Sequence, residues 1–198
     1  MIRNIFKHLG KIIKHKWWVM YYCFKCGLYF QGITHDMSKF SPTEFFESVK
    51  YYNGKYSPID ACKKVNGYSM AWFHHRGRNK HHWEFWIDNF SQGMTACKMP
   101  FKYALEMFCD FMGAGRAYYG KDFSVKSEYE WWQKKKREVI MYPKTYTFIN
   151  MMFECINDYG IEETFKQKKW LYEEIKPWYE NDNRKSVKVK NREFFDMG

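Results

Sequence analysis

The strongest constraint on the fold is a helical repeat near the N-terminus. The side chains that recur at steps of three and four residues are His8, Ile12, His15, Val19, Tyr22 and Cys26. Residues at this spacing share one face of an α-helix. The segment from Ile5 to about Phe30 is therefore predicted to form one long amphipathic helix whose buried face includes histidines.

Helical patterns continue along the rest of the chain. Ser41-Pro42-Thr43-Glu44 and Ser57-Pro58-Ile59-Asp60 place a serine at a helix cap, a proline at the first helical position and an acid two residues later. Further helices are expected over residues 83–89, 101–118, 127–142, 145–159 and 162–179. No alternating run is long enough to predict a strand, so the expected fold class is all-α.

The charge of the chain predicts a phosphate-bearing partner. The 198 residues carry a formal net charge of +11, and basic runs lie at 134–137 and 184–192. A basic surface attracts nucleotides, nucleic acid or an anionic membrane. We expect one helical domain over residues 1–181 and a short, basic, poorly ordered tail over residues 182–198.

Cysteine usage and hydropathy predict a cytoplasmic protein. Of the six cysteines only Cys23 and Cys26 form a CxxC pair, and no second pair completes a zinc site of that type. Cysteines of this kind are typical of small buried side chains in a reducing compartment. The apolar run at residues 17–24 is too short to span a bilayer, so no membrane association is expected.

Three stretches carry residues suited to metal binding. HHRGRNKHH, residues 74–82, holds four of the seven histidines, and His35-Asp36 offers an imidazole beside a carboxylate. Asp110 lies on an otherwise apolar helix, where a carboxylate is costly to bury unless it is paired or bound to metal. Imidazole and carboxylate together suit divalent transition metals.

The order of these residues resembles that of the HD superfamily, whose members are helical metal-dependent phosphohydrolases. Within it, the chain is most similar to a bacterial and phage family of unestablished function. Its phrases GLxHDLSKFSPTEF, HHKGRNxHHxEYW and EMxCDxxGAGRAYxGK read here GITHDMSKFSPTEF, HHRGRNKHHWEFW and EMFCDFMGAGRAYYGK. The likeness covers roughly residues 5–132.

The resemblance implies a ligand set for one or two divalent ions of manganese, iron, nickel, cobalt or zinc. His15, His35, Asp36 and Asp110 match the metal-binding positions of the superfamily, with Asp36 able to bridge two ions. The histidine cluster allows alternatives. His74 or His75 supplies one further ligand, and His81 or His82 supplies the next.

The same resemblance, with the basic charge, predicts the remaining site residues. Lys39, Arg78, Asn79, Lys80 and Arg116 are candidates to hold phosphate, and arginine suits bidentate contact. Asp36, Lys39 and Glu84 are expected to take part in catalysis, with Glu84 orienting a ligand histidine.

The predicted function is metal-dependent hydrolysis of a phosphoester, either a nucleotide or a cyclic-nucleotide signal. Two alternatives stay open at this point. A related arrangement holds two irons and uses oxygen on an alcohol or phosphonate. The other alternative is a non-catalytic nucleic-acid-binding protein with a structural metal. The oligomeric state is not constrained by the sequence.

Overall fold

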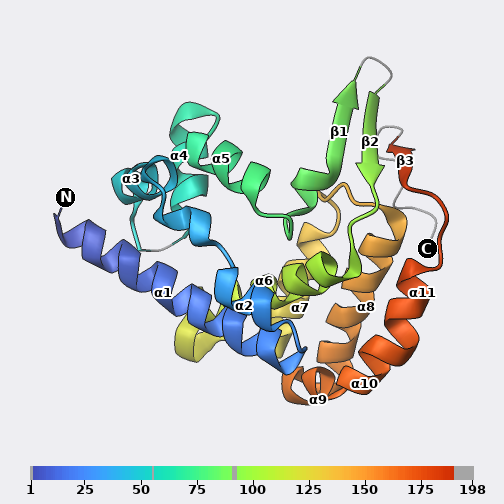
Figure 1. The fold of residues 1–198 in the computed structure, drawn as a ribbon. Helices are drawn as coiled ribbons and strands as arrows, with labels where there is room; N and C mark the ends of the chain where they lie inside the picture. Colours follow the sequence, from blue (N-terminus) through green and yellow to red (C-terminus); the bar gives the residue numbers. More distant parts are fainter. Residues whose placement is uncertain (1, 55, 91–92, 190–198) are drawn as a thin grey trace.

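The computed structural model describes residues 2–54, 56–90 and 93–189, and the chain is mostly helical with one small sheet (Figure 1). The predicted predominantly all-α fold is confirmed. No helix in these ranges is long and apolar enough to cross a membrane.

The elements follow one another in this order along the chain. The helices are α1 (Ile2–Lys25), α2 (Tyr29–Thr34), α3 (Pro42–Tyr51), α4 (Pro58–Asn66), α5 (Met70–Arg78), α6 (Phe101–Tyr119), α7 (Val125–Lys135), α8 (Pro143–Tyr159), α9 (Ile161–Lys166), α10 (Lys168–Trp170) and α11 (Lys176–Glu180). The short turns are η1 (Met37–Phe40), η2 (Trp83–Trp86), η3 (Gly120–Asp122) and the π-helical η4 (Leu171–Ile175). The strands β1 (Ile87–Phe90), β2 (Gly93–Cys97) and β3 (Ser186–Val189) form one antiparallel sheet in the order β1-β2-β3.

Helix α1 buries the predicted face. All six side chains of the repeat are buried: His8, Ile12, His15, Val19, Tyr22 and Cys26. The helix is shorter than expected, because Gly27 adopts a φ of 77° just after its last turn. A left-handed glycine ends a helix, and the chain then turns back into α2, which packs against α1.

The predicted helix starts agree with the structure. Ser41 caps α3, and its side chain accepts a hydrogen bond from the Glu44 backbone N–H at 3.4 Å. Pro58 opens α4 after Ser57, although the Ser57 side chain makes no capping bond. Helix α7 starts two residues before the predicted position, at a capping box formed by Ser124 and Ser127.

Two predictions of local structure were wrong. The segment 83–89 is not a helix, because Ile87 pairs with Ala96 across an antiparallel hairpin after the short turn η2. The segment after 181 contains β3, in which Val187 pairs with Ala96 of β2. A partner about 90 residues away stabilises that strand, which is why its local sequence resembles a tail. The rest of the expected tail, 190–198, lies outside the described residues.

The end of α7 also differs from expectation. The predicted helix over 127–142 stops at Lys135. Pro143 opens α8, and the residue before a proline is pushed towards extended backbone. Tyr142 accordingly has φ −58° and ψ 137°. The helix predicted over 162–179 is present as four consecutive helical segments, α9 to α11 with η4.

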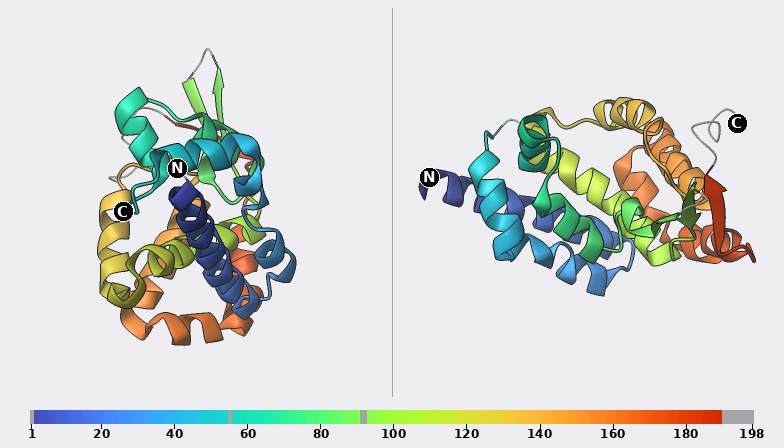
Figure 2. Two further views of the ribbon diagram at one scale, coloured as in Figure 1. Left: turned by 90° about the vertical axis from the view of Figure 1, so that its left-hand side faces the viewer. Right: turned by 90° about the horizontal axis from the view of Figure 1, so that it is seen from above.

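The core lies where α1, α6 and α8 meet, with α7 and α9 to α11 around them (Figures 1 and 2). Trp132 stacks on Phe153 with ring centroids 4.9 Å apart, and Tyr22 stacks on Phe165 at 4.8 Å. Helices α3, α4 and α5 form a second cluster that packs on α1 through α3. The two clusters bring the middle of α1 and of α6 and the last turns of α5 towards a common centre.

Helices α1 and α6 approach closely at Gly113. A Cβ atom at this position would lie 2.9 Å from the Val19 backbone nitrogen and 3.2 Å from its Cα. Backbone atoms cannot move aside as a flexible side chain can. Only a glycine therefore allows the two helices to come this close.

We expect Gly113→Ala to lower the free energy of unfolding by about 1–3 kcal/mol, because the added methyl group overpacks the α1–α6 contact. Gly10→Ala in α1 is the matched control, since a Cβ there meets no atom within 4 Å. It should stabilise the helix by about 0.5–1 kcal/mol. Urea unfolding measures both. Equal effects of the two substitutions would contradict the close-packing account.

Candidate metal centre

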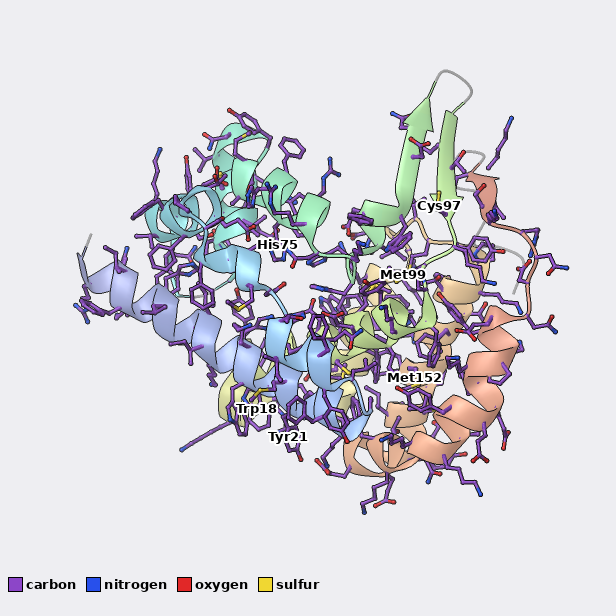
Figure 3. All side chains as sticks on the ribbon, viewed as in Figure 1. Trp18, Tyr21, His75, Cys97, Met99 and Met152 are labelled. Carbon is purple, nitrogen blue, oxygen red and sulfur yellow. The ribbon has the colours of Figure 1, made fainter. Side chains whose placement is uncertain are left out.

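Four separate parts of the chain converge on one buried carboxylate. Asp36 lies between α2 and η1, and it is 1% exposed. His35 directly precedes Asp36 after α2. The other side chains come from α1, α5, the loop after α5, and α6: they are His15, His75, His81, His82 and Asp110. Figure 3 labels His75 on α5, on the side of that helix nearer to α1 and α6.

The first group of donor atoms surrounds Asp36 Oδ2. His15 Nε2 lies 3.2 Å from Asp36 Oδ2 and 3.1 Å from Asp110 Oδ1. His35 Nε2 lies 3.3 Å from each of the same two oxygens. Ligand atoms that bind one cation at about 2.0–2.2 Å lie roughly 3.0–3.5 Å apart. The spacing of the four atoms is therefore compatible with a bound metal ion.

The second group surrounds the other oxygen of the same carboxylate. His75 Nε2 lies 3.3 Å and His81 Nε2 lies 3.4 Å from Asp36 Oδ1. His82 completes this group, in which all donor atoms lie within 4.8 Å of one another. Asp36 therefore faces one set of histidines with each of its oxygens.

Several of these donors have no hydrogen-bond partner although they are buried. They are His35 Nε2, Asp36 Oδ1, His81 Nε2 and His82 Nε2. A buried polar atom without a partner costs free energy of about 1–3 kcal/mol. His35 Nε2 belongs to the first donor group and the other three atoms to the second, so unpaired donors in both groups fit bound cations.

Two glutamates orient three of the histidines by contacting the Nδ1 atoms of their rings. Glu106 Oε1 lies 3.0 Å from His35 Nδ1 and 3.2 Å from His81 Nδ1. Glu44 Oε2 lies 2.7 Å from His75 Nδ1. A carboxylate at Nδ1 places the proton there and leaves Nε2 free to bind metal. The Nε2 atoms of these three histidines are the ones that face Asp36.

The electrostatics of the site favour a positive charge at its centre. Burial opposes ionisation of Asp36, but His35, Lys39 and His75 hold its pKa well below its usual range. Burial also opposes the imidazolium form of His35, yet Asp36 and Asp110 raise its pKa well above the usual value. Asp36, which is buried, and Asp110, which is partly buried, thus attract a proton to His35 when no metal is present, and a cation would take its place.

The pKa of His82 is shifted in the opposite direction to that of His35. Burial and the neighbouring His81 and His75 lower the pKa of His82 well below its usual value. The imidazole is therefore neutral at physiological pH, which is the form that binds a metal.

The backbone of Asp36 has a left-handed conformation, which is rare for a residue with a side chain. Its φ is 54°, and it is the only residue other than glycine with positive φ in the described ranges. Aspartate tolerates this left-handed conformation better than most residues. Strained backbone of this kind concentrates at functional sites.

The donor groups open into a cleft of about 560 Å³. This volume is within the usual range for small-molecule sites. His15, His75, His82 and Asp110 line it together with Lys39, whose Nζ lies 2.6 Å from Asp36 Oδ2. Burial opposes the charge on Lys39, but Asp36 and Asp110 raise its pKa, so the ammonium group is retained.

The other predicted site residues lie differently. His74 Nδ1 contacts Glu44 Oε1 at 2.6 Å and belongs to neither donor group. Glu84 lines the cleft, and the contacts expected of it as an orienting acid are made by Glu44 and Glu106. In the described part of the chain, four predicted phosphate-binding residues do not line the cleft: Arg78, Asn79, Lys80 and Arg116.

Those four residues have other surroundings. The Asn79 side chain donates to Ser38 Oγ at 2.7 Å and to the His75 carbonyl at 2.8 Å, which ties the end of α5 to η1. The Arg116 guanidinium stacks over Phe123 and donates to the Tyr22 hydroxyl at 3.1 Å. Arg78 and Lys80 are exposed.

Sequence reasoning missed both orienting glutamates and part of the cleft. Glu44 was interpreted only as a helix-cap residue. Glu106 precedes Asp110 by four residues, a spacing that puts both on one helix face and that serves as a usable signal. Among the cleft lysines, Lys135 belongs to the basic run at 134–137, whereas Lys11 and Lys63 carry no comparable local signal.

The fold and the donor groups define a helical protein with a candidate histidine–aspartate metal centre. A family model described as "Family of unknown function (DUF5662)" matches residues 4–155, which is well over half of the chain. The chain belongs to this family. No curated protein and no solved structure matches it.

We expect Asp36→Ala to abolish metal binding, because both donor groups depend on its carboxylate. His82→Ala should remove only the second group and leave binding at His15, His35 and Asp110. Elemental analysis after incubation with Mn²⁺ and desalting measures both, with circular dichroism to confirm folding.

Asp158→Ala is the matched control, since Asp158 is exposed on α8. It should bind as much metal as the unaltered chain. Equal metal content in Asp36→Ala and Asp158→Ala would contradict the assignment of the centre.

Proposed function

We propose that the protein is an HD-type metal-dependent phosphohydrolase that acts on a nucleotide-like phosphoester. The observation that carries the proposal is the pair of donor groups sharing Asp36, which supports two divalent ions bridged by one carboxylate. When bound, such ions acidify water and neutralise charge on phosphoryl oxygens.

The residues around the centre support chemistry on an anion. Lys39 lines the cleft and places an ammonium group beside Asp36. Lys11, Lys63 and Lys135 also line the cleft and add positive charge. Acids also line the cleft, so the lysines alone do not give it one sign of charge: these acids are Glu44, Asp60, Glu84, Asp110 and Glu128. Divalent ions held at the donor groups would add positive charge beside Lys39 and attract anions. This supports an anionic phosphoester as the substrate.

The aromatic lining of the cleft supports a nucleotide in particular. Trp72, Trp83, Phe111 and Trp131 line it along with the lysines. Flat aromatic rings stack on nucleobases with little dependence on sequence. The six cysteines, all of them unpaired, support the reducing, cytoplasmic setting in which nucleotides are abundant.

A di-iron oxygenase is the second candidate, and the histidine-rich second group favours it. Iron in the purified protein, together with oxygen consumption, would favour the oxygenase and contradict the hydrolase. The cleft lysines favour the hydrolase, because a phosphoester carries negative charge that they would bind.

We expect the protein to hydrolyse bis(p-nitrophenyl) phosphate with Mn²⁺, and a chelator to abolish that activity. Lys39→Met should lower kcat by about 10²–10³-fold, because a charge facing the reacting group is lost. Lys50→Met on the exposed face of α3 is the control and should behave like the unaltered chain. Unchanged kinetics in Lys39→Met would remove that residue from the site.

A further inference from the structure

The cleft extends along α6 beyond the metal centre. Asp110, Phe111, Ala114, Gly115 and Tyr118 all line it, and their spacing puts them on one helix face. Gly115 lies five positions after Asp110, which is about 7.5 Å along the helix axis. A ligand bound at the metal centre therefore reaches Gly115 if it has a second group beyond its phosphate.

A buried acid lies at this far end. Glu128 of α7 is 3% exposed and lines the cleft, and its Oε1 has no hydrogen-bond partner. Its carboxylate lies against Gly115, where a Cβ atom would come within 2.7 Å of Oε2. The absence of a side chain at Gly115 makes the space that the carboxylate occupies.

The surroundings leave this carboxylate available to a ligand. Burial raises the pKa of Glu128 to about 7, and nearby Arg116 acts in the opposite direction. Ionisation near neutral pH therefore costs little. A buried, unpaired acceptor that faces a cleft is stabilised when a ligand donates to it.

Aromatic rings line the same cleft as Glu128. Trp131 follows Glu128 by three residues on the same face of α7, and Phe111 lies beside Trp131 with ring centroids 5.2 Å apart. Trp83 lines the same cleft from η2. Apolar rings beside a few hydrogen-bonding groups are the usual composition of a site that holds a flat heterocycle.

We propose that Glu128 binds the guanine base of a nucleotide whose phosphate lies at the metal centre. This inference rests on the proposed function. An ionised carboxylate only accepts hydrogen bonds, and the N1–H and 2-amino group of guanine are two neighbouring donors that it pairs with in parallel. Hypoxanthine lacks the amino group, adenine presents a ring lone pair beside its amine, and uracil presents a single N–H flanked by two carbonyl oxygens that a carboxylate repels.

The test is equilibrium binding of GMP, IMP, AMP and UMP to the full chain loaded with Mn²⁺. GMP should bind about 10- to 100-fold more tightly than IMP, because IMP loses one hydrogen bond to a charged group. Glu128→Gln should remove this preference with metal content unchanged. Glu130→Gln, an exposed position on α7, should keep the preference.

Gly115→Ala gives an independent variant, because its methyl group displaces the Glu128 carboxylate while the acid itself stays in the chain. It should also lose the GMP preference. Equal binding of GMP and IMP to the unaltered chain, or a preference that survives Glu128→Gln, overturns the inference.

The failure of this inference and that of the proposed function are distinguishable. Hydrolysis of bis(p-nitrophenyl) phosphate by the unaltered chain without a base preference overturns the guanine assignment alone. A GMP preference that depends on Glu128, in a chain that hydrolyses no phosphoester, supports the guanine site and overturns the hydrolase.

Discussion

The arrangement of the whole molecule depends on one shared carboxylate. Asp36 is buried, lies in a left-handed backbone conformation, and has a set of histidines at each oxygen. A buried carboxylate in this setting is stable only when positive charge surrounds it. His15 of α1, His75 of α5, His35 and Lys39 supply that charge. The packing of the helices therefore determines the chemistry of the centre.

The helices hold the centre through packing and through a second layer of acids. Gly113 lets α6 approach Val19 of α1, which fixes Asp110 relative to His15. Glu106, which also lies on α6, holds the imidazole rings of His35 and His81 in place through their Nδ1 atoms. Restraint of this kind matters because a ligand group displaced by a fraction of an ångström weakens metal binding.

Local sequence patterns predicted the helices but not the contacts between distant parts. The buried face of α1 and the cap at Ser41 depend on nearby residues and can be derived from spacing, whereas the early end of α1 at Gly27 was missed. The pairing of β3 with β2, and the placement of Glu128 against Gly115, depend on tertiary contacts that no single segment encodes. The residues of the metal centre were named because their order resembles a known family, and the structure brings seven of the eight together. The exception, His74, differs from His75 only in the direction in which α5 points it.

Anomalous X-ray diffraction from crystals soaked in Mn²⁺ tests the central claim most directly. The account predicts two peaks that flank Asp36. One should contact His15, His35 and Asp110, and the other should contact His75, His81 and His82. Manganese bound elsewhere, with no peak at either oxygen of Asp36, would contradict it.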